Sequence, residues 1–416
     1  MRLIACSILI VLLHQISPLW TWIDSAHAGT PIHGAKAAAM QAAFVAVADD
    51  PSAIVHNPAG ITHLNGTHIY TGVTAVMGST EFKDPAGRTE ESDFKVYFPP
   101  HAYVTSDFNS KNMAFGLGLY SPFGIGGRQW SEEGLTRYLA TKNLISTLAL
   151  NPVFACKVLP HVSIGAGAFY IHATNESERM IDQSALGFSD GKFALKGKGG
   201  GFGYNLAVLL FPGREISFGM AYRSKTDVDQ EVDIRLIDLA PALHPLTGGS
   251  SADFNADATL RFPESLNFGL ACRSSRFLTL SVELEWIRWS RFDSMEVDLR
   301  HELPEAGITD FTVRFDYKDT WLYKIGADYE MNPNISIRAG YAYIENPVPN
   351  QTLSPANPDA DQHSMSIGLG YKRNQWHLDF FYMYEIFKRR SVANEAVTGE
   401  FRTSAHFAGL SFGYTF

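Results

Sequence analysis

Residues 407–416 read FAGLSFGYTF, and in this stretch aromatic or apolar residues alternate with small or polar ones. A period of two is typical of a β-strand with two different faces. A strand at the end of a chain has an unpaired edge, which is an aggregation hazard. Pairing of the last strand with the first removes that edge, so this stretch predicts a closed barrel.

The same alternation recurs in residues 278–286, 321–329, 335–343 and 376–384. In each segment one face carries apolar residues, with aromatics near the ends, and the other face carries small or charged residues. The segment LTLSVELEW, residues 278–286, places its leucines on one face and Glu283 and Glu285 on the other. This pattern is typical of a transmembrane strand with lipid outside and a polar lumen inside.

Short and long connections alternate between the predicted strands. Short turns fall at DFNSKN, VLPH, FPGRE, RSSR, EMNPN and YKRNQ, and longer connections lie near residues 80–95, 122–141, 175–196, 226–256, 290–310, 346–361 and 389–402. Outer-membrane barrels have this asymmetry, with short periplasmic turns and long extracellular loops. The segments predict an all-β fold of about 14 antiparallel strands. A large soluble sandwich or propeller explains the alternation but not the asymmetry.

Composition limits the other possibilities. The chain has 416 residues, 19% of them charged, and a net charge of −9 without a basic block, which disfavours a nucleic-acid-binding role. Arg2 and the apolar residues 3–13 resemble a secretory signal peptide, with a cut predicted at Gly29. The alternative is a membrane anchor, but His14 interrupts the apolar run well before the roughly 18 residues needed to span a bilayer. Cys156 and Cys272 are too few for a disulfide framework.

Residues 34–64 are rich in alanine and lack the strand alternation. They predict one or two short helices followed by a turn that contains proline. A segment with no place in the wall is expected to fold into the lumen as a plug, or hatch, as some barrels contain. The predicted divisions are therefore a signal peptide at 1–28, a hatch at 29–65 and a transmembrane barrel at 66–416.

Several stretches, in order along the chain, resemble the FadL/TodX family of outer-membrane transporters. They are ADDPSAIVHNPAGI, GLGLYSPFGIG, NPVFACKVLPHVSIGAGA, GFGYNLAVLLFPGREISFGMAYRS, FPESLNFGLA with WIRWSRF, and IRAGYAYIENPVPNQTLSPANPDADQHSMSIGLGYK. The resemblance covers nearly all of the mature chain. It implies a 14-stranded barrel, a luminal hatch and a lateral opening where an inward kink of the third strand interrupts the wall. Hydrophobic substrate is expected to leave sideways through that opening.

Local chemistry supports parts of this scheme. The NPAG turn combines a fixed φ, a side-chain amide and a flexible glycine, which suits a compact turn of the hatch or an ordinary exposed turn. The glycines and proline in AFGLGLYSPFGIGG indicate either a kink or simply the end of the strand. The predicted hatch residues are Asp49, Asp50, Asn57, Pro58 and Ala59, and those of the lateral opening are Gly116, Gly118, Pro122, Phe123 and Gly124.

Substrate-binding residues are predicted in two places. Leu236, Leu239 and Leu243 lie in a predicted extracellular loop, where they form either an exposed apolar patch or the buried side of a packed helix. Lys324 and Arg338 face inward by parity, where they meet either a fatty-acid carboxylate or the luminal acids in a salt-bridge network. Phe44 of the hatch completes the predicted set.

We therefore expect passive uptake of hydrophobic small molecules, most of all long-chain fatty acids, across the bacterial outer membrane. Alternatives are uptake of aromatic hydrocarbons or a non-specific diffusion porin. A hydrolase is disfavoured, because no G-x-S-x-G motif occurs and His363 and Ser364 point to opposite faces of a strand. We expect no cofactor, no metal and no catalytic residue. Expected partners are outer-membrane lipid, lipopolysaccharide and the barrel-assembly machinery, which would recognise Phe416, and the protein is expected to be a monomer.

Overall fold

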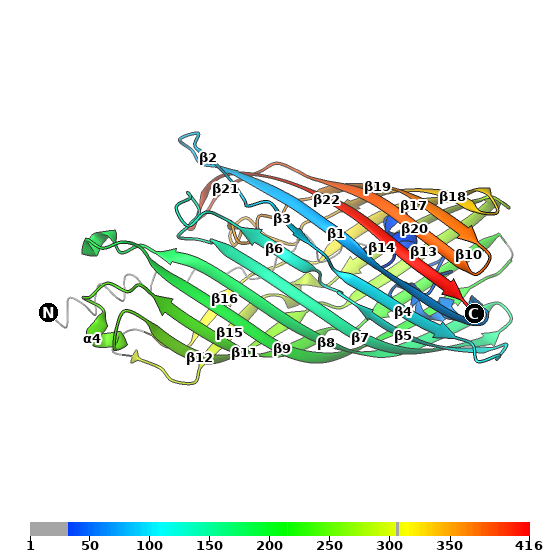
Figure 1. Cartoon of the computed structure of the whole chain (residues 1–416), viewed down its shortest axis with the longest axis horizontal. Helices are drawn as coiled ribbons and strands as arrows, with labels where there is room; N and C mark the ends of the chain where they lie inside the picture. The colour runs from blue at the N-terminus through cyan, green and yellow to red at the C-terminus, as the bar shows by residue number, and fades with distance from the viewer. Residues whose placement is uncertain (1–31, 214, 305–307) are drawn as a thin grey trace.

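The computed structural model describes residues 32–213, 215–304 and 308–416, so the predicted signal peptide lies outside the described residues. The described chain forms one antiparallel sheet of 22 hydrogen-bonded segments. Several segments follow one another along the same wall strand, and grouping them gives a closed barrel of 14 wall strands, as the sequence predicts. Figure 1 shows these strands tilted strongly against the long axis of the barrel.

The first seven wall strands are β1 (Thr67–Lys83); β2, β3 and β4 (Thr89–Glu91, Lys95–Tyr97, Pro100–Ser106); β5 and β6 (Met113–Tyr120, Ile125–Gln129); β7 (Lys142–Leu159); β8 (Val162–Ile181); β9 (Gly191–Leu210); and β10 and β11 (Ile216–Arg223, Thr226–Ile237). The last seven are β12 and β13 (Ala252–Phe262, Ser265–Ser275); β14 and β15 (Leu278–Ile287, Ser294–Leu299); β16 and β17 (Phe311–Arg314, Thr320–Asn332); β18 (Ile335–Ile344); β19 (Gln362–Arg373); β20 and β21 (Trp376–Phe387, Arg390–Ala393); and β22 (Thr398–Thr415).

The last wall strand closes the barrel on the first. β22 pairs with β1 over the whole length of both, from His68 opposite Thr415 to Lys83 opposite Glu400. The backbone N–H of Phe416 then donates to the carbonyl of Thr67 at 2.9 Å. The terminal strand that the sequence leaves unpaired therefore has a partner on both sides, β1 and β20.

Side chains alternate across the wall as the period of two requires. On β22, Leu410 and Phe412 are exposed on the outer face, whereas Ser411 is fully buried on the inner face. Four turns consist of two residues each. They are 160–161 between β7 and β8, 276–277 between β13 and β14, 333–334 between β17 and β18, and 374–375 between β19 and β20. These short turns lie at the end of the barrel that holds Phe416, and the long connections lie at the opposite end.

The described helices are short. α2 (Ala35–Ala39), α3 (Ala53–His56) and the 3₁₀ helix η2 (Pro58–His63) precede the first strand, and η3 (Ser184–Leu186), α4 (His244–Thr247) and η4 (Trp289–Arg291) lie between strands. Among residues 32–213, 215–304 and 308–416, no helix is long and apolar enough to cross a membrane.

Residues 32–66, here called the luminal segment, lie inside the barrel. α2 contacts β18, β19, β20 and β22, whereas η2 contacts β5, β7, β8 and β9 on the other side of the lumen. In Figure 1 the segment is the dark blue ribbon enclosed by strands, toward the end where the C-terminus lies. Its alanines Ala35, Ala37, Ala38 and Ala39 are buried, because small side chains let the helix fit closely against the inner wall.

Candidate functional site

Polar contacts from opposite walls hold the luminal segment in place. The Asn57 side chain donates to the carbonyls of Val45 (2.7 Å) and Val208 (3.1 Å) and accepts from the N–H of Ala59 (3.1 Å). The Glu283 carboxylate on β14 accepts from the N–H groups of Phe44 and Val45. These bonds satisfy backbone groups that have no strand or long helix to pair with, so the segment is fixed to the wall at several points.

Glycines on the inner wall make room for this segment. A Cβ placed on Gly118 would lie 2.8 Å from Cγ2 of Ile54, and one placed on Gly116 would lie 2.8 Å from Cδ1 of the same side chain. A Cβ placed on Gly165 of β8 would lie 2.4 Å from the backbone nitrogen of Ala59. Glycine occurs at these positions because a side chain would displace the luminal segment.

Backbone pairing between the second and third wall strands is interrupted. The ladder between β4 and β5 ends at the pair Ala102–Leu119. The next backbone hydrogen bond between the two wall strands joins the N–H of Asp93 to the carbonyl of Gln129 at 2.8 Å. Between these points, residues 94–101 and 120–128 are not paired with each other among the described backbone contacts, and this unpaired part of the wall is here called the wall gap.

Three prolines, Pro99, Pro100 and Pro122, lie in the wall gap and lack the N–H that a ladder needs. Gly116 and Gly118 do not belong to it, because both are paired with β4 and with β7. Of the predicted opening residues, Gly116 and Gly118 therefore lie outside the wall gap, whereas Pro122, Phe123 and Gly124 lie within it. Gly124, with φ of 85°, is the predicted residue whose backbone requires glycine there.

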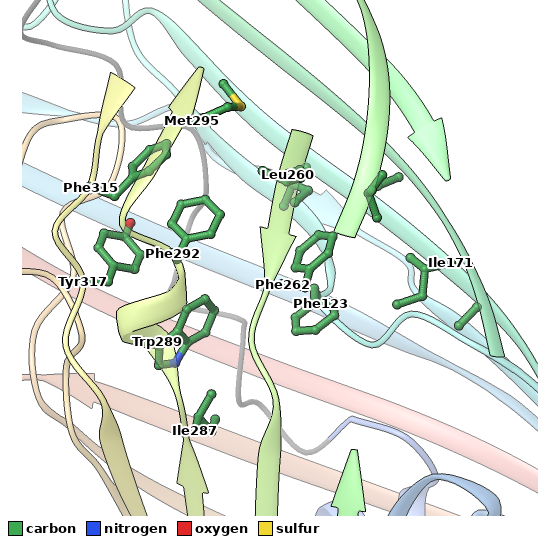
Figure 2. Packing of buried hydrophobic residues seen from close by; sticks show 14 of the residues in the cluster. Phe123, Ile171, Leu260, Phe262, Ile287, Trp289, Phe292, Met295, Phe315 and Tyr317 are labelled. Carbon is green, nitrogen blue, oxygen red and sulfur yellow. The ribbon is translucent and has the colours of Figure 1, made fainter. Parts of the chain in front are cut away.

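The third wall strand bends inward at the gap. The register of β6 on β7 is shifted by two residues relative to that of β5, and Ser121–Gly124 form the turn that takes up this excess. The Phe123 N–H donates to Thr147 Oγ1 at 3.1 Å. The Phe123 ring stacks on Phe262 of β12, with centroids 4.0 Å apart and planes at 12°. Figure 2 shows the two rings together, so the predicted opening residue Phe123 points into the lumen.

An aromatic layer continues from this pair around the part of the lumen nearer the long loops, here called the upper lumen. It consists of Phe123, Phe262, Trp289, Phe292, Phe315 and Tyr317. Phe292 lies 4.3 Å from Phe315 and 5.2 Å from Tyr317 between ring centroids, and Trp289 lies 6.0 Å from Tyr317. Figure 2 shows that these side chains come from the irregular residues between β14 and β17. The layer separates the long loops from the luminal segment.

A cavity of about 100 Å³ lies between the aromatic layer and the luminal segment. Its lining includes Pro122 and Phe123 of the wall gap, His33 and His56 of the luminal segment, and Arg223 of β10. Lys324, Glu283, Glu285 and Ile287 complete the opposite side. The cavity therefore brings two residues of the predicted opening and one predicted cation, Lys324, into one site.

The two predicted substrate-binding cations are held by luminal acids. Lys324 Nζ lies 3.1 Å from Glu283 and 2.5 Å from Glu285. Arg338 lies 3.2 Å from Asp328 and 2.5 Å from Asp379 and is outside the cavity lining. These contacts form the salt-bridge network that the sequence leaves as one of two alternatives.

Titratable groups of the luminal segment respond to burial. Burial, with a smaller contribution from Lys324, lowers the pKa of His56 to about 3, so this imidazole is neutral at pH 7. Burial raises the pKa of Asp50 to about 6, against the opposing effects of Lys36 and Ser52. Burial would lower the pKa of Lys36, but Asp49 and Asp328 raise it more strongly. The predicted hatch residues Asp49 and Asp50 thus both act on Lys36.

The remaining predicted residues occupy other places. Leu236, Leu239 and Leu243 are buried, so the alternative of an exposed apolar patch is wrong for this loop. They pack into the cluster that lines the upper lumen, because β11 turns Leu236 inward. Phe44 is fully buried against Ala37 and Met40, and Pro58 begins η2.

Sequence reasoning missed two residues of the site, Arg223 and Phe262. Arg223 ends β10 within the stretch AYRS, and its inward parity follows from Ala221 being buried on the same face. That parity was the available signal. Phe262 precedes Pro263, and nothing local to it indicates a partner in the third wall strand. His363 and Ser364, weighed as a catalytic pair, point apart, since His363 contacts Tyr341 and Ser364 contacts Gln41.

A closed 14-stranded barrel with an apolar outer face, short turns at one end and an occupied lumen defines an outer-membrane channel protein. The chain belongs to the outer membrane protein transport protein family (OMPP1/FadL/TodX), whose model matches residues 28–416. Members of this family are transporters and channels of the bacterial outer membrane.

Individual relatives are distant. A long-chain fatty acid transport protein of Escherichia coli O6:H1 is 25% identical over 366 residues, which cover 79% of each chain. A putative outer membrane protein of Neisseria meningitidis serogroup B is 26% identical over 442 residues, which cover 94% of each chain. A Pseudomonas aeruginosa FadL homologue has the same fold, with a TM-score of 0.78, 19% identity and coverage of 96% of this chain and 100% of that one. The Pseudomonas putida toluene transporter TodX also has this fold, with a TM-score of 0.73, 17% identity and coverage of 93% of this chain and 99% of that one.

Proposed function

We propose that this protein takes up hydrophobic monocarboxylates, of which long-chain fatty acids are the natural class, by passive diffusion through the barrel and out through the wall gap. Relatives include proteins named for fatty acid transport and for toluene transport. Fatty acids carry a carboxylate and toluene does not, so a cation in the cavity without a carboxylate partner favours fatty acids.

The main support for this proposal is the environment of Arg223, which lines the cavity. Its guanidinium lies 5.5 Å from the ring centroid of Tyr120 and 5.8 Å from that of Phe169, and it donates to the carbonyl of Val55 at 3.3 Å. No described carboxylate lies within ion-pair distance of it, whereas Lys324 in the same cavity binds two. A guanidinium can bind a carboxylate through two parallel hydrogen bonds, so Arg223 is suited to hold the head of a fatty acid.

The acyl chain would extend from Arg223 toward Phe123 and the wall gap. The cavity of about 100 Å³ accepts a headgroup but not a long chain. Uptake therefore requires Phe123 to leave Phe262. On the outer side of the gap, Phe94 and Phe98 are 69% and 60% exposed and present apolar surface to lipid. We propose that this is where the substrate enters the membrane.

The test compares oleate and toluene on the Arg223→Gln and Arg223→Lys variants of the purified, folded protein. A lost charge-assisted hydrogen bond costs about 1.5–3 kcal/mol, so we expect oleate to bind Arg223→Gln about 10 to 100 times more weakly. Arg223→Lys should restore part of the affinity. Arg402 on the exposed face of β22 provides a matched control, because Arg402→Gln removes the same charge far from the cavity.

A result in which Arg223→Gln binds oleate as tightly as the unmodified protein would exclude this anchor. Uptake of toluene, but not of oleate, would favour the second candidate, an aromatic hydrocarbon channel. The aromatic layer formed by Phe262, Trp289, Phe292 and Phe315 is the observation that supports it. A porin is less compatible with a lumen occupied by residues 32–66, and a single-channel recording with high ion conductance would support it.

The remaining partner assignments are also proposals. We propose that the luminal segment acts as a hatch and that the protein functions as a monomer without enzymatic activity. We further propose that the barrel-assembly machinery recognises Phe416 and that lipopolysaccharide surrounds the outer half of the barrel.

A further inference from the structure

A groove of about 530 Å³ lies on the outer face of the barrel, where the seventh, eighth and ninth wall strands are interrupted together. At this level β10 gives way to β11 and β12 to β13 through Lys225 and Glu264, and β14 gives way to β15 through η4. Four basic residues line the groove, namely Lys225, Arg261, Arg288 and Arg291. The interruption lets these side chains converge on one place, which regular strands would keep apart.

We infer that this groove binds the phosphorylated sugar headgroup of the lipid in the outer leaflet, the lipid A part of lipopolysaccharide. The inference uses the location of the protein in the outer membrane and does not depend on the transported compound.

The position of the groove relative to the membrane supports this. Tyr204 and Tyr222 line its lower edge, with ring centroids 5.9 Å apart. Trp286 of β14 pairs in register with Trp321 of β17 on the outer face just below Arg288. Aromatic residues at the ends of the apolar band mark the membrane interface. The basic residues therefore lie immediately outside the apolar band, on the side of the long loops, where lipid phosphates lie.

The charges in the groove are incompletely compensated. Arg288 lies 3.0 Å from Glu264, and Arg291 lies 2.5 Å from Asp227. Arg261 donates to the carbonyl of Ser294 at 3.2 Å. For Arg261 and Lys225, the described residues provide no carboxylate within ion-pair distance. Two arginines are thus held in position by acids, and two further cations are available to an anionic ligand.

The wall changes sign directly above the groove. Outward-facing Asp229, Glu231, Asp257, Glu296 and Asp298 line the next groove toward the long loops. Its cations are Lys198, Arg300 and Arg261, and Arg261 lies at the boundary because it lines both grooves. The upper groove therefore holds five acids and three bases. Phosphate is attracted by the lower groove and repelled by the upper one, so a phosphorylated lipid is held at one height. Below the groove, exposed Phe218 and Met220 of β10 offer the apolar surface that acyl chains cover. Free phosphate would use the cations but not this apolar surface.

The experiment measures binding of bisphosphorylated, hexa-acylated lipid A to the purified full-length barrel, stripped of lipopolysaccharide, in detergent by native mass spectrometry. We expect the Lys225→Ala/Arg261→Ala variant, which removes two charge-assisted contacts, to bind at least about tenfold more weakly, a change of about 1.4 kcal/mol or more. The matched control is Lys198→Ala/Arg300→Ala, which removes two exposed cations of the acidic groove and should change the affinity by less than about twofold, as exposed pairs contribute little.

Two ligand controls separate the possible sources of affinity. The same lipid without its phosphates should bind the unmodified protein about as weakly as lipid A binds the double variant, and inorganic phosphate at millimolar concentration should not displace lipid A. Lys225→Ala alone serves if the double variant loses its heat-modifiable folded form. Three results would each overturn the inference. The Lys225→Ala/Arg261→Ala variant could bind lipid A as tightly as the unmodified protein does. The unmodified protein could bind the dephosphorylated lipid as tightly as lipid A, or inorganic phosphate could displace lipid A.

Discussion

Phe123 belongs to the third wall strand and Phe262 to the eighth, yet their rings stack face to face with centroids 4.0 Å apart. A ring from one wall reaches a ring from a distant part of the wall only because residues 121–124 turn inward. The same turn that opens the wall gap therefore also closes the lumen. One side chain, Phe123, thus belongs both to the wall gap and to the aromatic layer.

Replacing Phe123 with alanine should separate these two effects. Wall pairing is untouched, so the barrel should fold, although truncating a buried Phe costs about 3–5 kcal/mol locally. We expect oleate to reach the cavity faster in stopped-flow binding measurements, because the ring that stacks on Phe262 is missing, while ion conductance stays low since residues 32–66 still occupy the lumen. Phe115→Ala on the lipid face of β5 is the control and should leave the association rate unchanged. An unaltered association rate in Phe123→Ala would mean that this ring does not limit access to the cavity.

Replacing Gly118 with alanine should loosen the luminal segment, because the new Cβ would lie 2.8 Å from Ile54. We expect faster proteolysis of residues 32–66 in the folded barrel. The penalty should shrink in an Ile54→Ala background, since residues in contact are energetically coupled. Gly78→Ala is the matched control, because its Cβ would meet nothing closer than 3.6 Å. Additive effects of the Gly118 and Ile54 changes would argue against this contact.

Replacing Lys324 with methionine should destabilise the luminal segment strongly. Glu283 would keep its bonds to the backbone of Phe44 and Val45 but lose its buried cation, a change that costs about 3–5 kcal/mol in comparable pairs. Lys388→Met breaks an exposed pair with Asp361 and should cost about 0–1 kcal/mol. Thermal unfolding of the two variants measures the difference. Similar melting temperatures for both would show that the luminal pair contributes no more than the exposed one.

The stability of the luminal segment should depend on pH through Asp50. Burial raises the pKa of this carboxyl from 3.8 to about 6, so the folded segment binds the proton more tightly than the unfolded one. Its contribution is complete below about pH 4 and is lost as the pH rises through about 6. Protection of residues 32–66 from hydrogen exchange, measured relative to the intrinsic exchange rate at each pH, should therefore decrease between pH 4 and pH 6. Asp50→Asn should flatten this dependence, and an unchanged profile in that variant would assign it to another group.

Deleting Phe416 should lower the amount of folded barrel in the membrane more than the uptake per folded molecule. The deletion removes one backbone hydrogen bond to Thr67 and an exposed aromatic anchor at the membrane interface. Quantifying the heat-modifiable form and uptake at matched amounts separates the two effects. Normal folded yield with reduced uptake would place Phe416 in transport instead.

The sequence predicts the barrel well, because a wall strand with one face to lipid and one to the lumen alternates apolar and polar residues with a period of two. The alternation in residues 278–286 and 407–416 predicts wall strands, and the pairing of β22 with β1 confirms closure. Inward parity likewise places Lys324 beside the acids of β14. Parity does not predict how deeply a residue is buried or which residue it contacts. Leu239 and Leu243 look exposed in a loop but are buried, because the loop folds over the upper lumen. Arg223 and Phe262 acquire their roles only from the inward turn at residues 121–124.

The bond from the N–H of Ala35 to Ser411 Oγ, 2.9 Å long, joins residues 376 positions apart. The luminal segment is synthesised first, but this contact forms only when the last strand is in place. Such long-range contacts form late in folding, because loop closure must come first. The final step of barrel assembly is therefore also the step that encloses the luminal segment. A barrel stalled before β22 pairs with β1 would leave residues 32–66 without this contact and open to proteases.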